Sequence, residues 1–99
     1  MSVRPVDTNP AILYNIPQNK RASFKVFMTN TTGSNVLAKL YVREGVGVVT
    51  DENLLTIVDV GGNTTVVIPS GVLNNSVIYC QVSSGNTITF KVNSLEESV

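Results

Sequence analysis

The sequence predicts an all-β protein, a single antiparallel β-sandwich of immunoglobulin-like or jelly-roll-like type with seven to eight short strands. The 99 residues include 17 valines, 6 isoleucines and 10 threonines, and these β-branched types pack well on pleated sheets. Turn-forming residues recur about every 8–12 residues, as they do in sandwiches. No stretch of about 11 residues shows the apolar spacing of a helix. A small closed barrel is the alternative architecture.

Residues 1–10 predict an extended arm. Pro5 and Pro10 each push the preceding residue toward extended geometry. Such an arm can lie along a neighbouring protein or add a strand to its sheet edge. We therefore expect the arm to be the main attachment element, with partner contacts from Val3, Arg4, Pro5 and Val6.

Two strands are predicted next, over residues 11–16 and 21–29, joined by a turn that begins at Pro17. In the first, Ile12, Tyr14 and Ile16 are expected on one side. The second has a clear period of two. Its core-facing residues are expected to be Ala22, Phe24, Val26 and Met28.

A polar loop over residues 30–35 leads to a third predicted strand, residues 36–43. Its core face is expected to hold Val36, Ala38, Leu40 and Val42. Residues 45–49 are ambiguous, since their glycines fit a flexible loop, a bulged strand or both. Residues 51–53 form the next predicted turn.

Residues 54–60 and 64–68 read as a hairpin around a turn at 61–63, and residues 69–71 are expected to end its second strand. Two more strands follow, over 77–82 and 87–92. Ile88, Phe90 and Val92 are expected on one face of the last strand. The sandwich domain is thus predicted over residues 11–92, with a short acidic tail over 93–99.

Composition argues against an enzyme and against bound cofactors or metals. The chain has no histidine, which removes the commonest general base and metal ligand. One cysteine, Cys80, permits neither an intramolecular disulfide nor a multi-cysteine zinc site. Because Cys80 falls within a predicted strand, we expect it to be a small residue of the core. The paired acids Asp51 and Glu52 fall in a turn, which favours a solvated position over a catalytic or calcium-binding one.

Charge and hydropathy argue against nucleic acid and membrane partners. Seven basic and seven acidic residues give a formal net charge of zero, so no strong field attracts a phosphate backbone. No apolar run reaches the roughly 18 residues that a membrane-spanning helix needs. The first residues lack the apolar segment of a secretory signal.

Two aromatic residues are predicted on outward faces. Phe27 shares its predicted face with Lys25, and Tyr41 shares its predicted face with Lys39 and Arg43. An exposed aromatic ring flanked by long basic side chains can anchor an interface. It can equally lie under a loop, so both interpretations stay open for these two residues.

Three segments carry a family resemblance. Residues 13–22, Leu-Tyr-Asn-Ile-Pro-Gln-Asn-Lys-Arg-Ala, resemble the opening hairpin of small β-sandwich virion proteins of tailed bacteriophages. Asn30-Thr31-Thr32-Gly33-Ser34 is similar to the turn that follows in that family, and residues 68–73 look like the segment before its penultimate strand. Asn19 stands where glycine is usual, and asparagine tolerates the same left-handed backbone region.

The resemblance implies a non-enzymatic structural protein of the virion, made in the host cytoplasm. We expect it to decorate or cement the capsid by contacts with other virion proteins, such as the major capsid protein. Low charge favours self-association, and a trimer would suit a capsid lattice. The alternative is a tail, neck or fibre component, including a carbohydrate-binding receptor module in which Tyr14 or Tyr41 stacks on a sugar.

Overall fold

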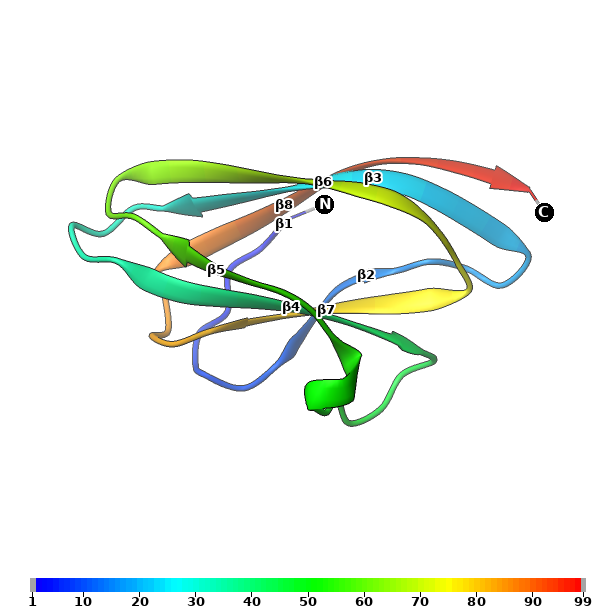
Figure 1. The fold of residues 1–99 in the computed structure, drawn as a ribbon, viewed down its shortest axis with the longest axis horizontal. Helices are drawn as coiled ribbons and strands as arrows, with labels where there is room; N and C mark the ends of the chain where they lie inside the picture. Colours follow the sequence, from blue (N-terminus) through cyan, green and yellow to red (C-terminus); the bar gives the residue numbers. More distant parts are fainter. Residues whose placement is uncertain (1, 99) are drawn as a thin grey trace.

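Two four-stranded antiparallel sheets pack face to face in the computed structural model, which describes residues 2–98 and the side chains of all of these except 70–74 and 98 (Figure 1). One sheet has the order β1-β8-β3-β6 and the other β2-β7-β4-β5. The strands are β1 (Ser2–Val3), β2 (Ala11–Asn15), β3 (Lys20–Asn30), β4 (Val36–Glu44), β5 (Leu54–Val60), β6 (Thr64–Asn74), β7 (Ser76–Val82) and β8 (Ile88–Ser98).

The strand pairing is that of a jelly roll. β1 pairs with β8, β2 with β7, β3 with β6 and β4 with β5, all antiparallel. The chain therefore forms one long hairpin, in which the first four strands pair with the last four in reverse order. This hairpin is wound so that consecutive strand pairs fall in opposite sheets. Within residues 2–98 the two sheets stay separate. The predicted sandwich is confirmed, with eight strands, and the closed barrel is excluded.

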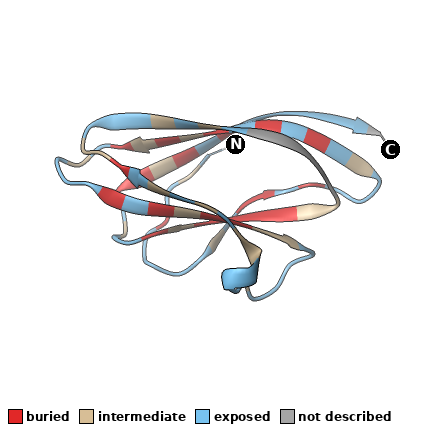
Figure 2. Ribbon diagram, in the orientation of Figure 1, coloured by how far each residue is buried: buried red, intermediate tan, exposed pale blue. Residues whose placement is uncertain are grey.

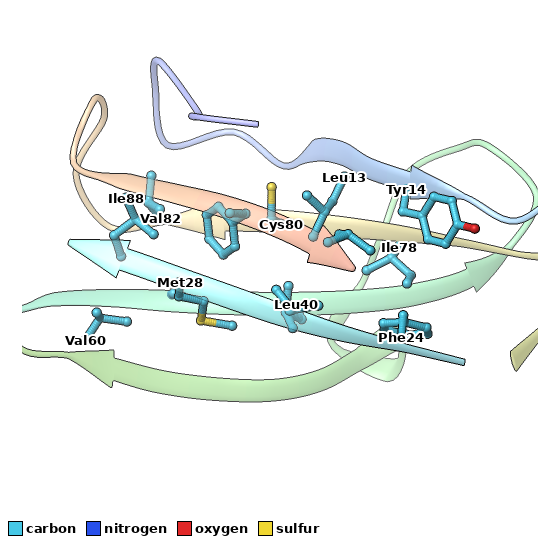
Figure 3. Close-up of a cluster of buried hydrophobic side chains, with 14 of the residues drawn as sticks. Leu13, Tyr14, Phe24, Met28, Leu40, Val60, Ile78, Cys80, Val82 and Ile88 are labelled. Carbon is cyan, nitrogen blue, oxygen red and sulfur yellow. The ribbon is translucent and has the colours of Figure 1, made fainter. Parts of the chain in front are cut away.

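The core lies between the sheets and follows the predicted period of two. Ala22, Phe24, Val26 and Met28 are buried on β3, as are Ile88, Phe90 and Val92 on β8. Figure 2 shows the resulting alternation of buried and exposed residues along β3. On β4 the predicted core residues Val36, Ala38 and Leu40 are buried, and Val42 packs half-buried against the same cluster. The buried side chains of β3 and β8 meet Leu13, Leu40 and Cys80 from the facing sheet (Figure 3).

The first predicted strand departs from simple alternation. A bulge between Ile12 and Tyr14 shifts the register against β7. Leu13 and Tyr14 are both buried as a result, and Ile12 is exposed. The expectation that Ile12 lies on the same side of the strand as Tyr14 and Ile16 is wrong, because one extra residue in a strand moves the following side chains to the other face. The Tyr14 ring packs edge-on against Phe24, with centroids 6.4 Å apart.

Two predicted strand ends are also wrong. Residues 69–71 do not end β6, which continues to Asn74 through a bulge opposite Ser23 and Lys25. β6 is an edge strand, where a proline such as Pro69 is tolerated. Residues 93–98 are not a tail, because they extend β8 and pair with the first half of β3.

Asparagine supplies the left-handed backbone at four tight turns. Asn19, Asn63, Asn75 and Asn86 have φ between 53° and 60°, a region that asparagine enters more readily than most residues. Asn75 alone separates β6 from β7, which belong to different sheets. The glycine-like behaviour expected of Asn19 is therefore confirmed.

A second, smaller apolar cluster lies on the outer face of the β2-β7-β4-β5 sheet. It consists of Tyr41, Val77 and Tyr79, and Val49 and Leu54 pack over it. The covering segment is the ambiguous stretch after β4, which forms a loop, followed by a 3-10 turn over Asp51–Asn53. Figure 1 shows this turn outside the sheet, on the side away from the main core.

Candidate interaction surfaces

The predicted arm is bound along its own domain. Ser2 and Val3 pair with Lys91 and Phe90 of β8, and Val3 packs against the main core. Pro5 is buried. Farther along, the side-chain amide of Gln81 donates a hydrogen bond to the Thr8 carbonyl oxygen at 2.8 Å. The arm thus contributes a short strand and several contacts to the sandwich it precedes.

Arg4 fastens the arm to the loop before β8. Its guanidinium donates to the carbonyl oxygen of Asn86 at 2.6 Å and to the hydroxyl oxygens of Thr31 and Thr89 at 3.2 and 3.3 Å. The backbone N–H of Asn86 in turn donates to the Pro5 carbonyl oxygen at 2.8 Å. Of the four arm residues predicted to contact a partner, only Val6 leaves a large apolar side chain in solvent, at 73% exposure.

Tyr41 is not available to a partner. It points outward from β4, as the sequence predicts, but the loop after β4 covers it and leaves the residue 6% exposed. Its hydroxyl donates to Oε1 of Gln81 at 2.7 Å. The Tyr79 hydroxyl accepts a hydrogen bond from the Gly47 backbone N–H at 2.9 Å and so holds the loop in place.

Neither Tyr14 nor Tyr41 has an exposed ring that could stack on a sugar. All three tyrosines of the chain are buried. Burial raises the pKa of the Tyr14 hydroxyl. Any carbohydrate recognition would have to use other side chains.

Phe27 occupies the position the sequence predicts. It lies half-buried on the outer face of β3, opposite Val67 of β6 and Lys91 of β8. Lys25 and Lys91 beside it are exposed. A shallow hollow lined by Ser2, Phe27, Lys91, Val92 and Asn93 opens at this point of the surface. We call Phe27, Val67, Lys25 and Lys91 the Phe27 patch.

A second exposed apolar surface, centred on β5, was not predicted from the sequence. Ile57 and Leu55 of β5 are 52% and 49% exposed, and Leu37 of the neighbouring β4 is 46% exposed. β5 is one of the two edge strands of its sheet. The signal was present in the sequence, because residues 54–60 are apolar at five of their seven positions, including Leu55 and Ile57. A strand with only one buried face is instead expected to alternate with polar residues.

No reactive group emerges among the residues that the structure describes. Cys80 is fully buried, and burial raises the pKa of its thiol to about 12. Within the described part of the chain, no three potential metal-ligating side chains from His, Cys, Asp or Glu gather in one place. A search of the described residues also finds no helix long and apolar enough to cross a membrane. The Arg21–Glu97 pair, at 3.0 Å, is solvent-exposed and contributes little to stability.

Comparisons with known proteins identify no match for this chain. No protein-family model, curated protein or solved structure matches the chain. A proposal for the function therefore rests on the sequence and on the surfaces described above.

Proposed function

We propose that this chain is a non-enzymatic structural protein of a bacteriophage virion that decorates or cements the capsid through protein–protein contacts. The single observation that carries the proposal is the Phe27 patch. An aromatic ring held half-buried in the middle of a sheet face, beside two exposed lysines, has the composition of an interface anchor.

Three further observations support this role. The jelly-roll strand order occurs in viral capsid and lectin domains, although a fold alone does not fix a function. The resemblance of residues 13–22 to small phage virion proteins favours the capsid over a lectin role. Zero net charge leaves little repulsion between neighbouring copies on a lattice.

The Phe27 patch indicates the chemistry of the partner surface. The ring and Val67 form an apolar centre, and Lys25 and Lys91 provide basic margins. A complementary surface would offer an apolar recess bordered by carboxylates, because opposite charges at the rim speed and orient association. We propose that the major capsid protein provides this surface.

The first test is the copy number in purified particles of the phage that encodes the chain. Quantitative mass spectrometry gives the ratio of this chain to the major capsid protein. Capsid decoration predicts copies on the order of hundreds, as a symmetric lattice requires. A number near a dozen would instead assign a neck, baseplate or fibre position, and absence from the particle would overturn the proposal.

The second test asks whether the Phe27 patch makes the contact. Phe27→Ala should reduce the occupancy of particles by at least tenfold, whereas Leu95→Ala should leave it unchanged. Leu95 is a suitable control because it is an exposed apolar residue of β8 in the same sheet, outside the patch. Equal occupancy for both variants would reject the patch as the attachment site.

A further inference from the structure

We propose that β5 pairs with β5 of a second copy of this chain, antiparallel across a two-fold axis. The two β2-β7-β4-β5 sheets would then join into one continuous sheet. This inference rests on the proposed function as an assembling protein, and it adds the surface and the symmetry of self-association.

The outer edge of β5 is open. In the described structure β5 is hydrogen-bonded to β4 on one side and ends its sheet on the other. Along an edge strand, alternate backbone N–H and C=O groups point away from the sheet, and they offer a template for another strand. Along the seven residues of β5, Leu54–Val60, such groups point outward at alternate positions.

The other edges carry features that discourage pairing. β2 has only five residues, contains a bulge, and lies between Pro10 and Pro17. β6 contains Pro69, which has no N–H to donate. β8 is covered by β1 at Phe90 and Lys91, and its remaining part carries two acids, Glu96 and Glu97. Prolines, bulges, short strands and charges are the usual means of blocking edge pairing.

β5 is protected only by a bulge at Leu55, between the residues that pair with Leu40 and Tyr41 of β4, and by one acid near its end. Residues 54–60 include no proline and no glycine, and Asp59 is their only charged residue. The half-exposed side chains of Leu55 and Ile57 lie along this edge, and Leu37 lies on the neighbouring strand. A second copy would cover these side chains as well as the backbone groups, and burial of apolar surface stabilises the pairing.

The pairing register follows from the length of the strand. Full use of seven residues places Ile57 opposite its own symmetry mate, and Asp59 then lies opposite Leu55 of the second copy. The two Asp59 carboxylates are separated by about 14 Å along the strand direction at roughly 3.4 Å per residue. Like charges therefore do not meet in this register, and the formal net charge of zero adds no general repulsion.

A two-fold contact of this kind closes on itself. Each copy uses the same edge, so the product is a dimer and not a fibre. A trimer, the state that would suit a capsid lattice, would require a different contact. The Phe27 patch lies on the other sheet, so dimerisation through β5 leaves it free for the capsid.

The test compares two lysine substitutions by sedimentation velocity over a concentration series. Wild type and Val67→Lys should both form dimers, and Ile57→Lys should weaken dimerisation at least tenfold. Val67 is a matched control because it is a half-exposed apolar residue, 44% exposed, on the edge strand of the other sheet. A monomeric wild type, a trimer, or equal weakening by both variants would overturn the proposed edge.

Cysteine cross-linking provides a second readout that does not require a destabilising charge. Ile57→Cys should form a covalent dimer under mild oxidation, since residues opposite each other in antiparallel strands have Cα atoms about 4.5–5.5 Å apart, within disulfide range. Val67→Cys should remain monomeric on a non-reducing gel, and buried Cys80 should not react. Absence of the Ile57→Cys cross-link would reject the register. Copy number in particles is measured separately, so failure of the dimer and failure of the virion role give different results.

Discussion

The hydroxyl of Tyr41 donates a hydrogen bond to Oε1 of Gln81, 2.7 Å away. The amide nitrogen of the same Gln81 donates to the Thr8 carbonyl oxygen at 2.8 Å. One side chain on β7 therefore connects the covered tyrosine of β4 to the N-terminal arm. The N-terminal arm and Tyr41, both predicted from the sequence to contact a partner, are thus held by hydrogen bonds within the chain.

Loss of the Gln81 side chain should loosen the arm. Gln81→Ala removes both hydrogen bonds, each of which contributes about 0.5–1.5 kcal/mol, and Tyr41→Phe removes only the first. We expect urea unfolding to show the larger loss for Gln81→Ala. Limited proteolysis should cut the arm faster in Gln81→Ala than in Tyr41→Phe. Identical cleavage of the two variants would show that the Thr8 contact does not hold the arm.

Gly85 is predicted to be essential for arm docking. A Cβ atom at this position would overlap the carbonyl oxygen of Val6. Gly85→Ala should therefore displace the arm or shift the loop before β8, at a cost of about 1–3 kcal/mol. Gly33→Ala is the control, because a Cβ there meets no atom within 4 Å. Thermal unfolding of the two variants measures the difference, and a Tm for Gly85→Ala equal to that of Gly33→Ala would contradict it.

Asn30 should be the most sensitive polar residue of the sandwich. Its buried amide donates to the carbonyl oxygens of Ser34 and Val60 at 2.7 and 3.0 Å. Its Oδ1 accepts from the backbone N–H and the hydroxyl of Thr32 at 2.9 and 2.7 Å. Asn30→Ala would leave buried polar groups without partners, which is more costly than the loss of an exposed hydrogen bond.

We expect Asn30→Ala to lower the free energy of unfolding by about 3 kcal/mol, measured by urea denaturation. Asn35→Ala is the comparison from the same loop. Asn35 accepts a single exposed hydrogen bond from the Gly62 N–H at 3.2 Å, so its loss should cost about 1 kcal/mol or less. A loss for Asn30→Ala no larger than that for Asn35→Ala would show that its four contacts are replaceable.

The sequence predicts those parts of the fold that follow from alternation. Val26 and Met28 are buried as expected, because β3 pairs without a break against β8 and its period of two persists. Ile12 is misplaced because a bulge inserts one residue without any distinctive composition. Pro69 looks like a strand end, and only its position on an edge strand, set by contacts distant in sequence, makes it compatible with β6.

The interaction surfaces were less predictable than the core. Phe27 lies on its expected face because that face depends on local alternation alone. Tyr41 also faces outward, but its exposure depends on a loop whose folded position is fixed by Tyr79 and Arg43, the latter donating to the Val48 carbonyl oxygen at 2.7 Å. The exposed edge at Ile57 depends on sheet order, which pairs strands far apart in the chain.

The buried thiol of Cys80 should make stability depend on pH in the alkaline range. Burial raises its pKa from 9.0 to about 12, whereas the unfolded chain has a thiol close to the ordinary value. Between these two values the unfolded state loses the proton and the folded state keeps it. The stabilising contribution of the neutral thiol is therefore fully present below about pH 9 and declines as pH rises, by up to about 1.4 kcal/mol per pH unit.

Cys80→Ala isolates this effect from other groups that titrate in the same range. The substitution leaves a small cavity between the sheets, where Cys80 lies in the main core (Figure 3), so it should cost about 1 kcal/mol at pH 7. Above pH 9 the wild type should lose stability more steeply than Cys80→Ala, so the two unfolding free energies should meet at about pH 10 and cross above it, since a loss of about 1.4 kcal/mol per pH unit soon exceeds the offset of about 1 kcal/mol. Urea denaturation at several pH values from 7 to 11 measures both curves. Parallel curves would show that the thiol ionises equally well in the folded and unfolded states, and would contradict the tight packing around Cys80.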